Sequence, residues 1–197
     1  MVAQEERKHQ RMTVEEWRAL LRTSDVKYEY SNGWVYAMAG GSADHSAIAI
    51  NVIRDMQDAL GERPCRVYNS DMAVRLSPSE YRFPDVTVTC DERDRGRVTE
   101  VQTPRVIVEV LSDSTEKDDR IGKFALYGTC ASVREYVLIA TRYQAVEVYR
   151  RGQPRWTYQG YGPGDSVELE SIDVRLPVAG LYRLTDVPLP SERATPA

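Results

Sequence analysis

Val106-Ile107-Val108-Glu109-Val110-Leu111 is a run of apolar residues that contains one acidic residue. Glu109 has apolar neighbours in both directions, which is typical of a central strand covered on both faces of a sheet. A carboxylate in such a strand needs a proton, an ion-pair partner or a metal ion, because an isolated buried charge is costly. Glu109 is therefore a candidate site residue. The alternative is a structural acid paired with a nearby arginine.

A second candidate acid, Asp85, lies in the extended segment before this strand, directly after Pro84. Proline has no backbone N–H, so the hydrogen-bond ladder should be interrupted there, as at an edge or a bulge. If the two segments pair, the carboxylates of Asp85 and Glu109 can converge at one end of the sheet. Two carboxylates, a backbone carbonyl and waters suit a hard cation, Mg²⁺ or alternatively Mn²⁺. The lack of a Cys or His cluster argues against zinc.

Hydrophobic periodicity predicts three main helices, at residues 14–22, from Ser42 or Asp44 to about 60, and from Ser114 or Thr115 to about Tyr127. Thr13 and Glu16 form a capping box before the first helix. Extended segments are predicted at residues 27–30, 34–38, 65–76, 81–90, 104–111, 134–140 and 145–149, with a β-rich stretch after Gly152. Asn32-Gly33, between the first two segments, is typical of a type I′ hairpin turn.

Between residues 43 and 140 the predicted order is helix, three strands, helix, strand. The three strands can form a meander, and the helix at 115–127 can carry the chain right-handed to a parallel fourth strand. The sequence thus predicts an α/β (α+β) fold, a mixed sheet flanked by helices, with an N-terminal helix and hairpin and a β-rich C-terminal extension. We expect one domain at residues 12–187, between a flexible N-terminus (1–11) and a flexible tail (188–197).

Charge and composition restrict the function. The chain of 197 residues has a net charge of −4 and a pI of about 5.4, whereas a dedicated duplex-binding protein is usually basic. Nucleic-acid contacts would rest on local patches, for which the candidates are Arg93, Arg95, Arg97, Arg142, Arg150, Arg151 and Arg155. The acids interleaved with the first three favour a plain solvated surface instead.

The cysteines and the apolar segments bear on the location of the protein. Cys65, Cys90 and Cys130 lie far apart, an odd count without CxxC spacing, which predicts reduced thiols. No run of 18 apolar residues is present. The sequence therefore predicts a cytoplasmic protein with no membrane partner.

Several short motifs together resemble the Uma-type family of restriction endonucleases in the PD-(D/E)XK nuclease superfamily. These motifs are Tyr28-Glu29, Asn32-Gly33, Ala39-Gly40-Gly41, His45, Ser70-Asp71, Phe83-Pro84-Asp85-Val86, Ile107-Val108-Glu109-Val110-Leu111-Ser112, and Asp119-Arg120 with Lys123 and Tyr127. They cover residues 12 to about 150. The resemblance implies a restriction-endonuclease-like fold, a Mg²⁺-dependent endonuclease acting on DNA, and a homodimer.

The resemblance also implies roles for residues of the site. Asp85, Glu109 and the carbonyl of Val110 would hold Mg²⁺, and Glu29 would ligand a second metal or hold a water. His45, in the first turn of its helix, would lie at the same site, where backbone N–H groups favour a phosphate. For His45 the alternative is an exposed or capping residue.

One residue departs from the family signature: Leu111 stands two positions after Glu109, where a lysine is expected. Lys123 would substitute for it and act on the attacking water, with Tyr127 on the same helical face. The alternative for Lys123 is a surface pair with Asp119 at i,i+4 spacing. Asp71 would be a structural acid or line the cleft, and we favour the structural role.

Two other functions remain open at this point. The chain could be a catalytically silent binding or regulatory module, which the net charge and Leu111 favour. It could also hydrolyse a small phosphoester, for which a deep narrow pocket would be expected. The retained carboxylates favour the nuclease, because acids repel nucleic acid and a pure binding module has little need of them.

Overall fold

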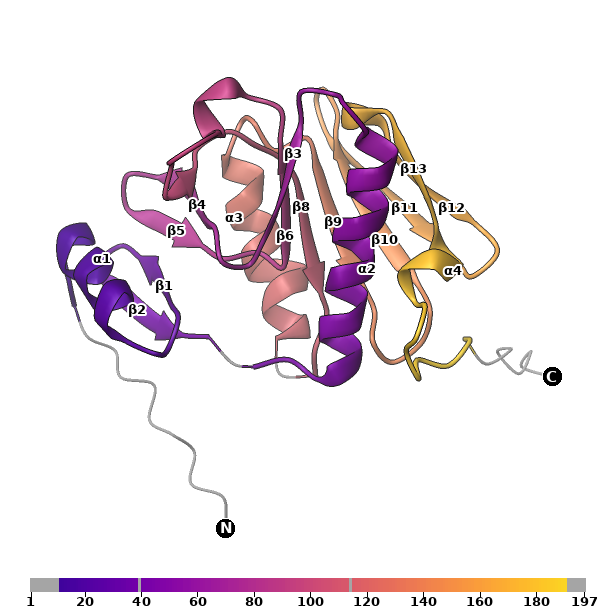
Figure 1. Ribbon diagram of the computed structural model, residues 1–197, viewed down its shortest axis with the longest axis horizontal. Helices are drawn as coiled ribbons and strands as arrows, with labels where there is room; N and C mark the ends of the chain where they lie inside the picture. Colours follow the sequence, from indigo (N-terminus) through magenta and orange to yellow (C-terminus); the bar gives the residue numbers. More distant parts are fainter. Residues whose placement is uncertain (1–10, 39, 114, 191–197) are drawn as a thin grey trace, which may run out of the picture.

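The computed structural model describes residues 11–38, 40–113 and 115–190. A six-stranded sheet forms its centre (Figure 1). In spatial order its strands are β11 (Trp156–Tyr161), β10 (Val146–Arg151), β9 (Glu135–Ile139), β8 (Pro104–Val110), β6 (Val86–Thr89) and β3 (Arg66–Asn69). The mixed sheet flanked by helices confirms the predicted fold class.

The central strand β8 pairs antiparallel with β6 and parallel with β9. Residues Val106 to Leu111 are all buried, as the apolar run predicted. The parallel pair needs a crossover, which the π-helical turn η2 (Asp118–Lys123) and helix α3 (Phe124–Thr129) supply. The prediction of a helix at about 115–127 is correct except that its middle part, residues 118–123, is π-helical. Ser114 lies outside the described residues.

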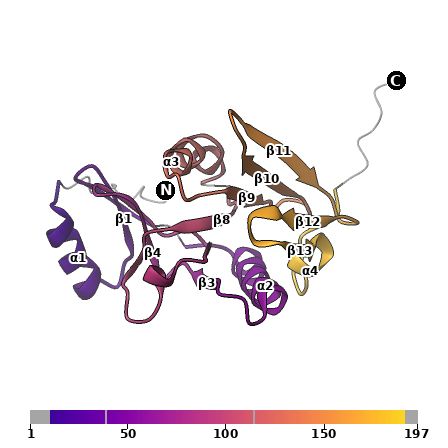
Figure 2. The same ribbon diagram turned by 90° about the horizontal axis from the view of Figure 1, so that it is seen from above.

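Helices cover both faces of the central sheet (Figure 2). On one face lies α3. On the other lies α2 (Ala43–Leu60), which begins after the N-cap Ser42 and ends at Gly61, where φ is 55°. The C-terminal extension, made of β12 (Ser166–Leu169), β13 (Val174–Pro177) and α4 (Val178–Leu181), packs beside α2 in one apolar cluster. The predicted β-rich extension is thus part of the core.

A second, five-stranded sheet lies beside the central one. Its strands in spatial order are β2 (Trp34–Ala37), β1 (Tyr28–Ser31), β5 (Glu80–Arg82), β4 (Ala73–Ser77) and β7 (Glu100–Val101). The hairpin turn has Asn32 at φ 49° and Gly33 at φ 90°, as the type I′ prediction requires. Helix α1 (Val14–Thr23) has the predicted capping box and packs Trp17 against Tyr81, with ring centroids 4.7 Å apart.

The prediction of one three-stranded meander is wrong in part. β3, β6 and β8 do follow one another in the central sheet, but each of the first two extended segments is broken. The first breaks at Asn69–Met72, where the side chain of Asn69 accepts a hydrogen bond from the N–H of Asp71 at 3.1 Å. The second breaks at Phe83–Asp85, because Pro84 cannot donate to the ladder. The other halves, β4 and β5, extend the hairpin into the second sheet.

The two sheets share a buried apolar cluster. Val74 and Val101 from the second sheet pack with Ile107 and Tyr136 from the central sheet and Tyr127 from α3. A core that crosses from one sheet to the other is what a single folding unit requires. The predicted limits of the domain remain a prediction, and most of the two terminal segments, residues 1–10 and 191–197, lies outside the described residues.

The prediction of three reduced cysteines is wrong for two of them. Cys65 and Cys90 form a disulfide. Arg66 pairs with Thr89 in the antiparallel β3–β6 ladder, so the residues just beyond this pair, although 25 positions apart in sequence, are brought together. Cys130 is a buried thiol, as expected. The predicted cytoplasmic location loses the support of the cysteines and stays a prediction. In the described residues no helix has the length and apolar character needed to cross a membrane.

Candidate active site

Asp85 lies between β5 and β6, where the ladder is interrupted. Its Oδ2 accepts a hydrogen bond from the backbone N–H of Val110 at 2.7 Å. Val110 is the last residue of β8. Its N–H therefore donates to the Asp85 carboxylate instead of to a backbone carbonyl of a neighbouring strand. The side chain is only 16% exposed, and its other oxygen, Oδ1, makes no hydrogen bond to any described residue.

Glu109 receives two side chains from the crossover helix. Its Oε1 accepts a hydrogen bond from the Tyr127 hydroxyl at 2.8 Å and lies 3.0 Å from Nζ of Lys123. Lys123 and Tyr127 are four residues apart, so they reach the same carboxylate from one helical face. The side chain of Lys123 is 13% exposed and that of Glu109 is 5% exposed. Lys123 therefore points into the site rather than to solvent.

The sequence interpretation missed Asp119 as a residue of this site. The ammonium of Lys123 lies 2.8 Å from Asp119 Oδ1, and the Thr115 hydroxyl donates to Asp119 Oδ2 at 2.7 Å. The i,i+4 pair of Asp119 and Lys123 does form, but it is not on the surface, because the Asp119 side chain is 2% exposed. Lys123 is thus held between two buried acids.

His45 lies beside Asp85. Its Nε2 is 3.2 Å from Asp85 Oδ2, and its backbone N–H donates to the N-cap hydroxyl of Ser42 at 3.2 Å. A Cβ on Gly41 would lie 2.6 Å from His45 Nδ1, so a larger residue there would displace the ring. The hydrogen bond to Asp85 raises the pKa of His45. Burial opposes this rise, and the charge of Asp85 and the carbonyl of Val110 add to it.

Glu29 approaches from the second sheet. It lies on β1, where its Oε1 accepts a hydrogen bond from the N–H of Phe83 at 3.3 Å and its Oε2 is 3.7 Å from Arg82 Nε. Phe83 is two residues before Asp85, so the bond ties Glu29 to the segment that carries Asp85. The negative charge of Glu29 raises the pKa of both Glu109 and Lys123, as expected for an acid at the same site.

Glu109 has a raised pKa, so its protonated form persists to a higher pH than is usual for a glutamate. Burial raises the pKa of Glu109 to about 8, the ammonium of Lys123 opposes this, and the charges of Asp85, Asp119 and Glu29 add to it. Burial lowers the pKa of Lys123, but the surrounding acids outweigh it and leave that pKa above its usual value. The site therefore has more acids than cations.

The donor atoms can be compared with the needs of a metal ion. In the described part of the chain no group of three His, Cys, Asp or Glu residues is arranged to hold a metal. Asp85, Glu109 and the carbonyl of Val110 offer oxygen only, which fits a hard divalent cation and not zinc. A cation would also offset the causes of the raised pKa of Glu109, which are burial first and then the charges of neighbouring acids. The residues present therefore fit such an ion.

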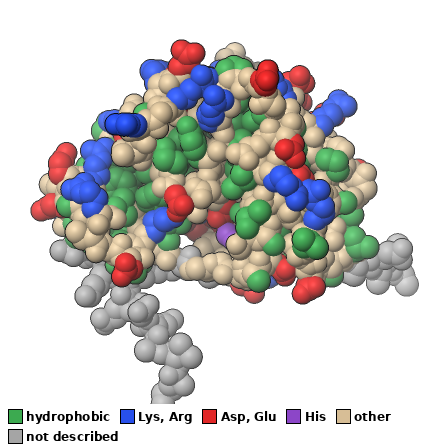
Figure 3. Space-filling view, viewed as in Figure 1, with side chains coloured by type: hydrophobic (Ala, Val, Ile, Leu, Met, Phe, Trp, Pro, Cys, Tyr) green, Lys and Arg blue, Asp and Glu red, His purple; other side chains and the backbone are tan. Residues whose placement is uncertain are grey.

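Other candidates lie apart from this cluster. Asp71 is an exposed acid paired with Lys27 at 2.8 Å, and this ion pair and Asn69 lower its pKa. Arg93 pairs with Asp91 at 2.7 Å, and Arg142 pairs with Asp113 at 2.7 Å. Figure 3 shows basic and acidic side chains interspersed over one face of the molecule. Arg93 and Arg142 therefore belong to an ordinary charged surface, which for Arg93 is what the interleaved acids indicated.

Comparisons with known proteins bear on the family and the fold of this chain. Residues 14–179 match the model of a family named Uma2 and described as "Putative restriction endonuclease". The chain is 36% identical to the "Uncharacterized protein slr1290" of Synechocystis sp., over 80% of this chain and 84% of that one. It is 31% identical to the "Uncharacterized protein sll1609" of the same organism, over 81% and 92%.

A solved structure has a similar fold. It is the crystal structure of "a putative nuclease belonging to DUF820" from Anabaena variabilis, with a TM-score of 0.67 and 19% sequence identity. The alignment covers 84% of this chain and 96% of that one. At this identity the similarity shows the fold alone.

Proposed function

This chain belongs to the Uma2 family, and from that premise we propose that it is a divalent-metal-dependent endonuclease that hydrolyses phosphodiester bonds in DNA. One observation carries the proposal: Nζ of Lys123 lies 3.0 Å from Glu109 Oε1, at the end of β8 that Asp85 also contacts. A buried ammonium beside an oxygen donor set for a cation suits phosphodiester hydrolysis, because both positive charges can stabilise the charge that develops on the phosphate. The finer predictions of Mg²⁺, a homodimer and a cytoplasmic location are part of the same proposal.

The proposed mechanism divides the work among the residues of the site. Asp85, Glu109 and the Val110 carbonyl would hold the cation, which when bound would supply positive charge against the scissile phosphate. Lys123 orients the attacking water and stabilises the negative charge of the transition state. Tyr127 and Asp119 are positioning residues, since the first fixes Glu109 and the second fixes Lys123. Glu29 completes the site from the second sheet, and His45 holds Asp85.

The test combines metal binding with cleavage. Mg²⁺ and Mn²⁺ are titrated into wild type, Asp85→Asn and Glu109→Gln by calorimetry, and the same proteins are assayed on plasmid and single-stranded DNA. The amide variants keep an acceptor for Val110 and Tyr127, so they remove charge with little change in shape. We expect both to lose metal binding and cleavage. Asp71→Asn is the matched control, because Asp71 is an acid paired with Lys27 outside the site. Cleavage at the wild-type rate by Asp85→Asn would rule out the assignment.

Lys123 is tested separately. Lys123→Met keeps most of the side-chain volume and removes the ammonium, and we expect it to lower kcat by about 100-fold or more while the metal still binds. Lys117→Met, six residues earlier in the chain, is the matched control. An unchanged kcat in Lys123→Met would leave the lysine as a structural partner of Glu109 and Asp119.

A catalytically silent binding module is the second candidate. Leu111 occupies the position of the signature lysine, and the net charge of −4 is unfavourable for DNA binding. Metal binding by wild type without cleavage of either DNA would favour this candidate. The absence of metal binding would leave Asp85 and Glu109 as structural acids.

A further inference from the structure

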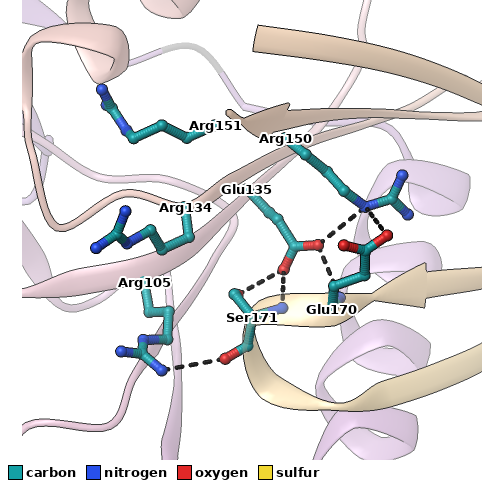
Figure 4. Close-up of a pocket in the computed structure, with 7 residues that line it drawn as sticks. All are labelled: Arg105, Arg134, Glu135, Arg150, Arg151, Glu170 and Ser171. Carbon is teal, nitrogen blue, oxygen red and sulfur yellow. Dashed lines mark hydrogen bonds and ion pairs between the residues drawn. The ribbon is translucent and has the colours of Figure 1, made fainter. Parts of the chain in front are cut away.

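A pocket of about 310 Å³ opens at the start of β8 and β9 (Figure 4). Arg105 lies near the start of β8, whereas Glu109 lies near its end. The pocket is therefore at the other end of the central sheet from the acid cluster. Its lining is strongly basic and consists of Arg105, Arg134, Glu135, Arg150, Arg151, Glu170 and Ser171.

Three of these arginines form a row across adjacent strands. The N–H of Arg134 donates to the carbonyl of Arg105 at 2.8 Å, and the N–H of Arg151 donates to the carbonyl of Arg134 at 2.8 Å. Figure 4 shows the three guanidinium groups on the same side of the pocket. Like charges on neighbouring strands destabilise a sheet unless something offsets their repulsion.

No carboxylate of the described residues pairs with this row. Arg105 donates to the carbonyl of Ser171 at 3.1 Å. Arg151 donates to the carbonyls of Val133, Gly128 and Cys130 at 2.7, 2.9 and 2.8 Å, and its guanidinium lies 4.5 Å from the centroid of the Trp156 ring. The side chain of Arg134 has no hydrogen bond or ion pair to a described residue. Burial and the charge of Arg134 lower the pKa of Arg151.

The acids of the pocket are directed elsewhere. Glu135 is buried, and its carboxylate accepts hydrogen bonds from the N–H of Glu170 at 2.9 Å and from the N–H and hydroxyl of Ser171 at 3.2 and 2.5 Å. Arg150 faces this acid, with its Nε 3.3 Å from Glu135 and 3.5 Å from Glu170. Arg150 is thus neutralised, and the row of Arg105, Arg134 and Arg151 keeps its positive charge.

We propose that the row is a binding site for a phosphoryl group, separate from the Asp85–Glu109 site. Arg105 and Arg134 can present paired N–H donors that match phosphate oxygens. Arg151, whose Nε and Nη2 donate to backbone carbonyls, adds its positive charge and the N–H groups of Nη1. Three positive charges suit an anion with more than one negative charge. Backbone carbonyls and Trp156 hold Arg151 in place before any ligand arrives, which reduces the ordering cost of binding. The phosphoryl group belongs either to a small phosphorylated molecule or to a nucleic-acid backbone. The proposal rests on the pocket alone and does not depend on nuclease activity.

The test measures binding without metal, so that it is independent of the acid cluster. Inorganic phosphate, pyrophosphate and a short DNA duplex are titrated into the full chain in the presence of EDTA. The variants are Arg134→Ala and the double variant Arg105→Ala/Arg134→Ala, whose truncated side chains are exposed. Arg22→Ala is the matched control, because Arg22 is exposed at the end of α1 and makes no ion pair to a described residue. Thermal unfolding checks that each variant is folded.

We expect Arg134→Ala to weaken binding about tenfold and the double variant to weaken it further, because each lost charge-assisted contact is worth about one decade. Arg22→Ala should bind as wild type does. Loss of phosphate or pyrophosphate binding in the variants supports a site for a small phosphorylated molecule. Loss confined to the DNA duplex supports a backbone contact. Wild type that binds none of the three probes, or variants that bind as wild type does, would overturn the proposal.

Discussion

Glu109 is the residue whose ionisation should govern the behaviour of the metal-free protein. Its pKa rises from 4.5 to about 8 on folding because of burial, so the folded chain takes up a proton that the unfolded chain releases. The stabilisation is complete below the unfolded pKa and is lost as the pH rises through about 8. The free energy of unfolding should therefore fall between about pH 5 and about pH 9. Urea unfolding at several pH values measures this fall.

Glu109→Gln provides the comparison, because the amide has no proton to lose. Its free energy of unfolding should depend less on pH than that of wild type. His45 has a raised pKa and acts in the same direction, but it is present in both proteins. Parallel curves for the two proteins would contradict the raised pKa of Glu109. Added Mg²⁺ should stabilise wild type most at high pH, since the metal needs the ionised carboxylate.

At the residue scale the sequence identified the acids better than their partners. Glu109 could be identified because a charge inside a buried apolar strand is exceptional. Asp85 could be identified because it follows Pro84, where the ladder of the preceding segment should be interrupted. The pairing of Asp119 with Lys123 was considered, but its place in the site could not be predicted, because an i,i+4 pair has the same spacing on an exposed and on a buried helical face. Only its buried environment distinguishes a positioning residue from a surface acid.

Helix α2 carries His45 to Asp85, and its start depends on one cap. The Ser42 hydroxyl accepts the N–H of His45 at 3.2 Å. Ser42→Ala should lower the free energy of unfolding by about 1 kcal/mol, and Ser42→Asp should restore it, because aspartate also caps. Urea unfolding measures both. Ser46→Ala, one turn later on the exposed surface of the same helix, is the control and should be neutral or slightly stabilising. Equal effects of the two alanine substitutions would refute the cap.

At the element scale, the sequence predicted the ends of helices and the hairpin turn, but not the points where the chain passes from one sheet to the other. Helix ends and the hairpin turn could be predicted from a few neighbouring residues, and the structure confirms each of them. These residues are Thr13, Ser42 and Gly61 at helix ends and Asn32-Gly33 in the turn. The local sequence near Asp71 and Pro84 is compatible with a break in each strand. It does not show which sheet the two halves of each broken strand will join. Which half of a broken strand joins which sheet depends on distant partners such as β1 and β8.

The whole molecule should unfold in one step, because the cluster around Val74, Ile107 and Tyr127 joins the two sheets. Trp17 lies in the cluster under α1, and Trp156 packs against the shared cluster. Variants that keep only Trp17 or only Trp156, with phenylalanine at the other tryptophans, report on each region. In each variant the fluorescence and circular dichroism transitions in urea should coincide. A Trp17 transition at lower urea would show that the second sheet unfolds separately, and would contradict the single domain at 12–187.

At this scale the sequence predicted the order of elements and the parallel crossover, but not the second sheet or the disulfide. Cys65 and Cys90 become neighbours only through the register of β3 and β6. The arginine row likewise arises from register, because residues 105, 134 and 151 come together only when β8, β9 and β10 pair.

The bond between Glu29 and Phe83 spans 54 residues of chain, and this separation has a consequence for folding kinetics. Asp85, Glu109 and Lys123 are brought together by strands and a helix that follow one another closely, whereas β1 must wait for β5. Closing the longer loop costs more entropy, and contacts distant in sequence tend to form late. Within a single cooperative folding step, we therefore expect the contacts of Asp85, Glu109 and Lys123 to be formed in the transition state and the contact of Glu29 with Phe83 to form after it, which φ-value analysis measures.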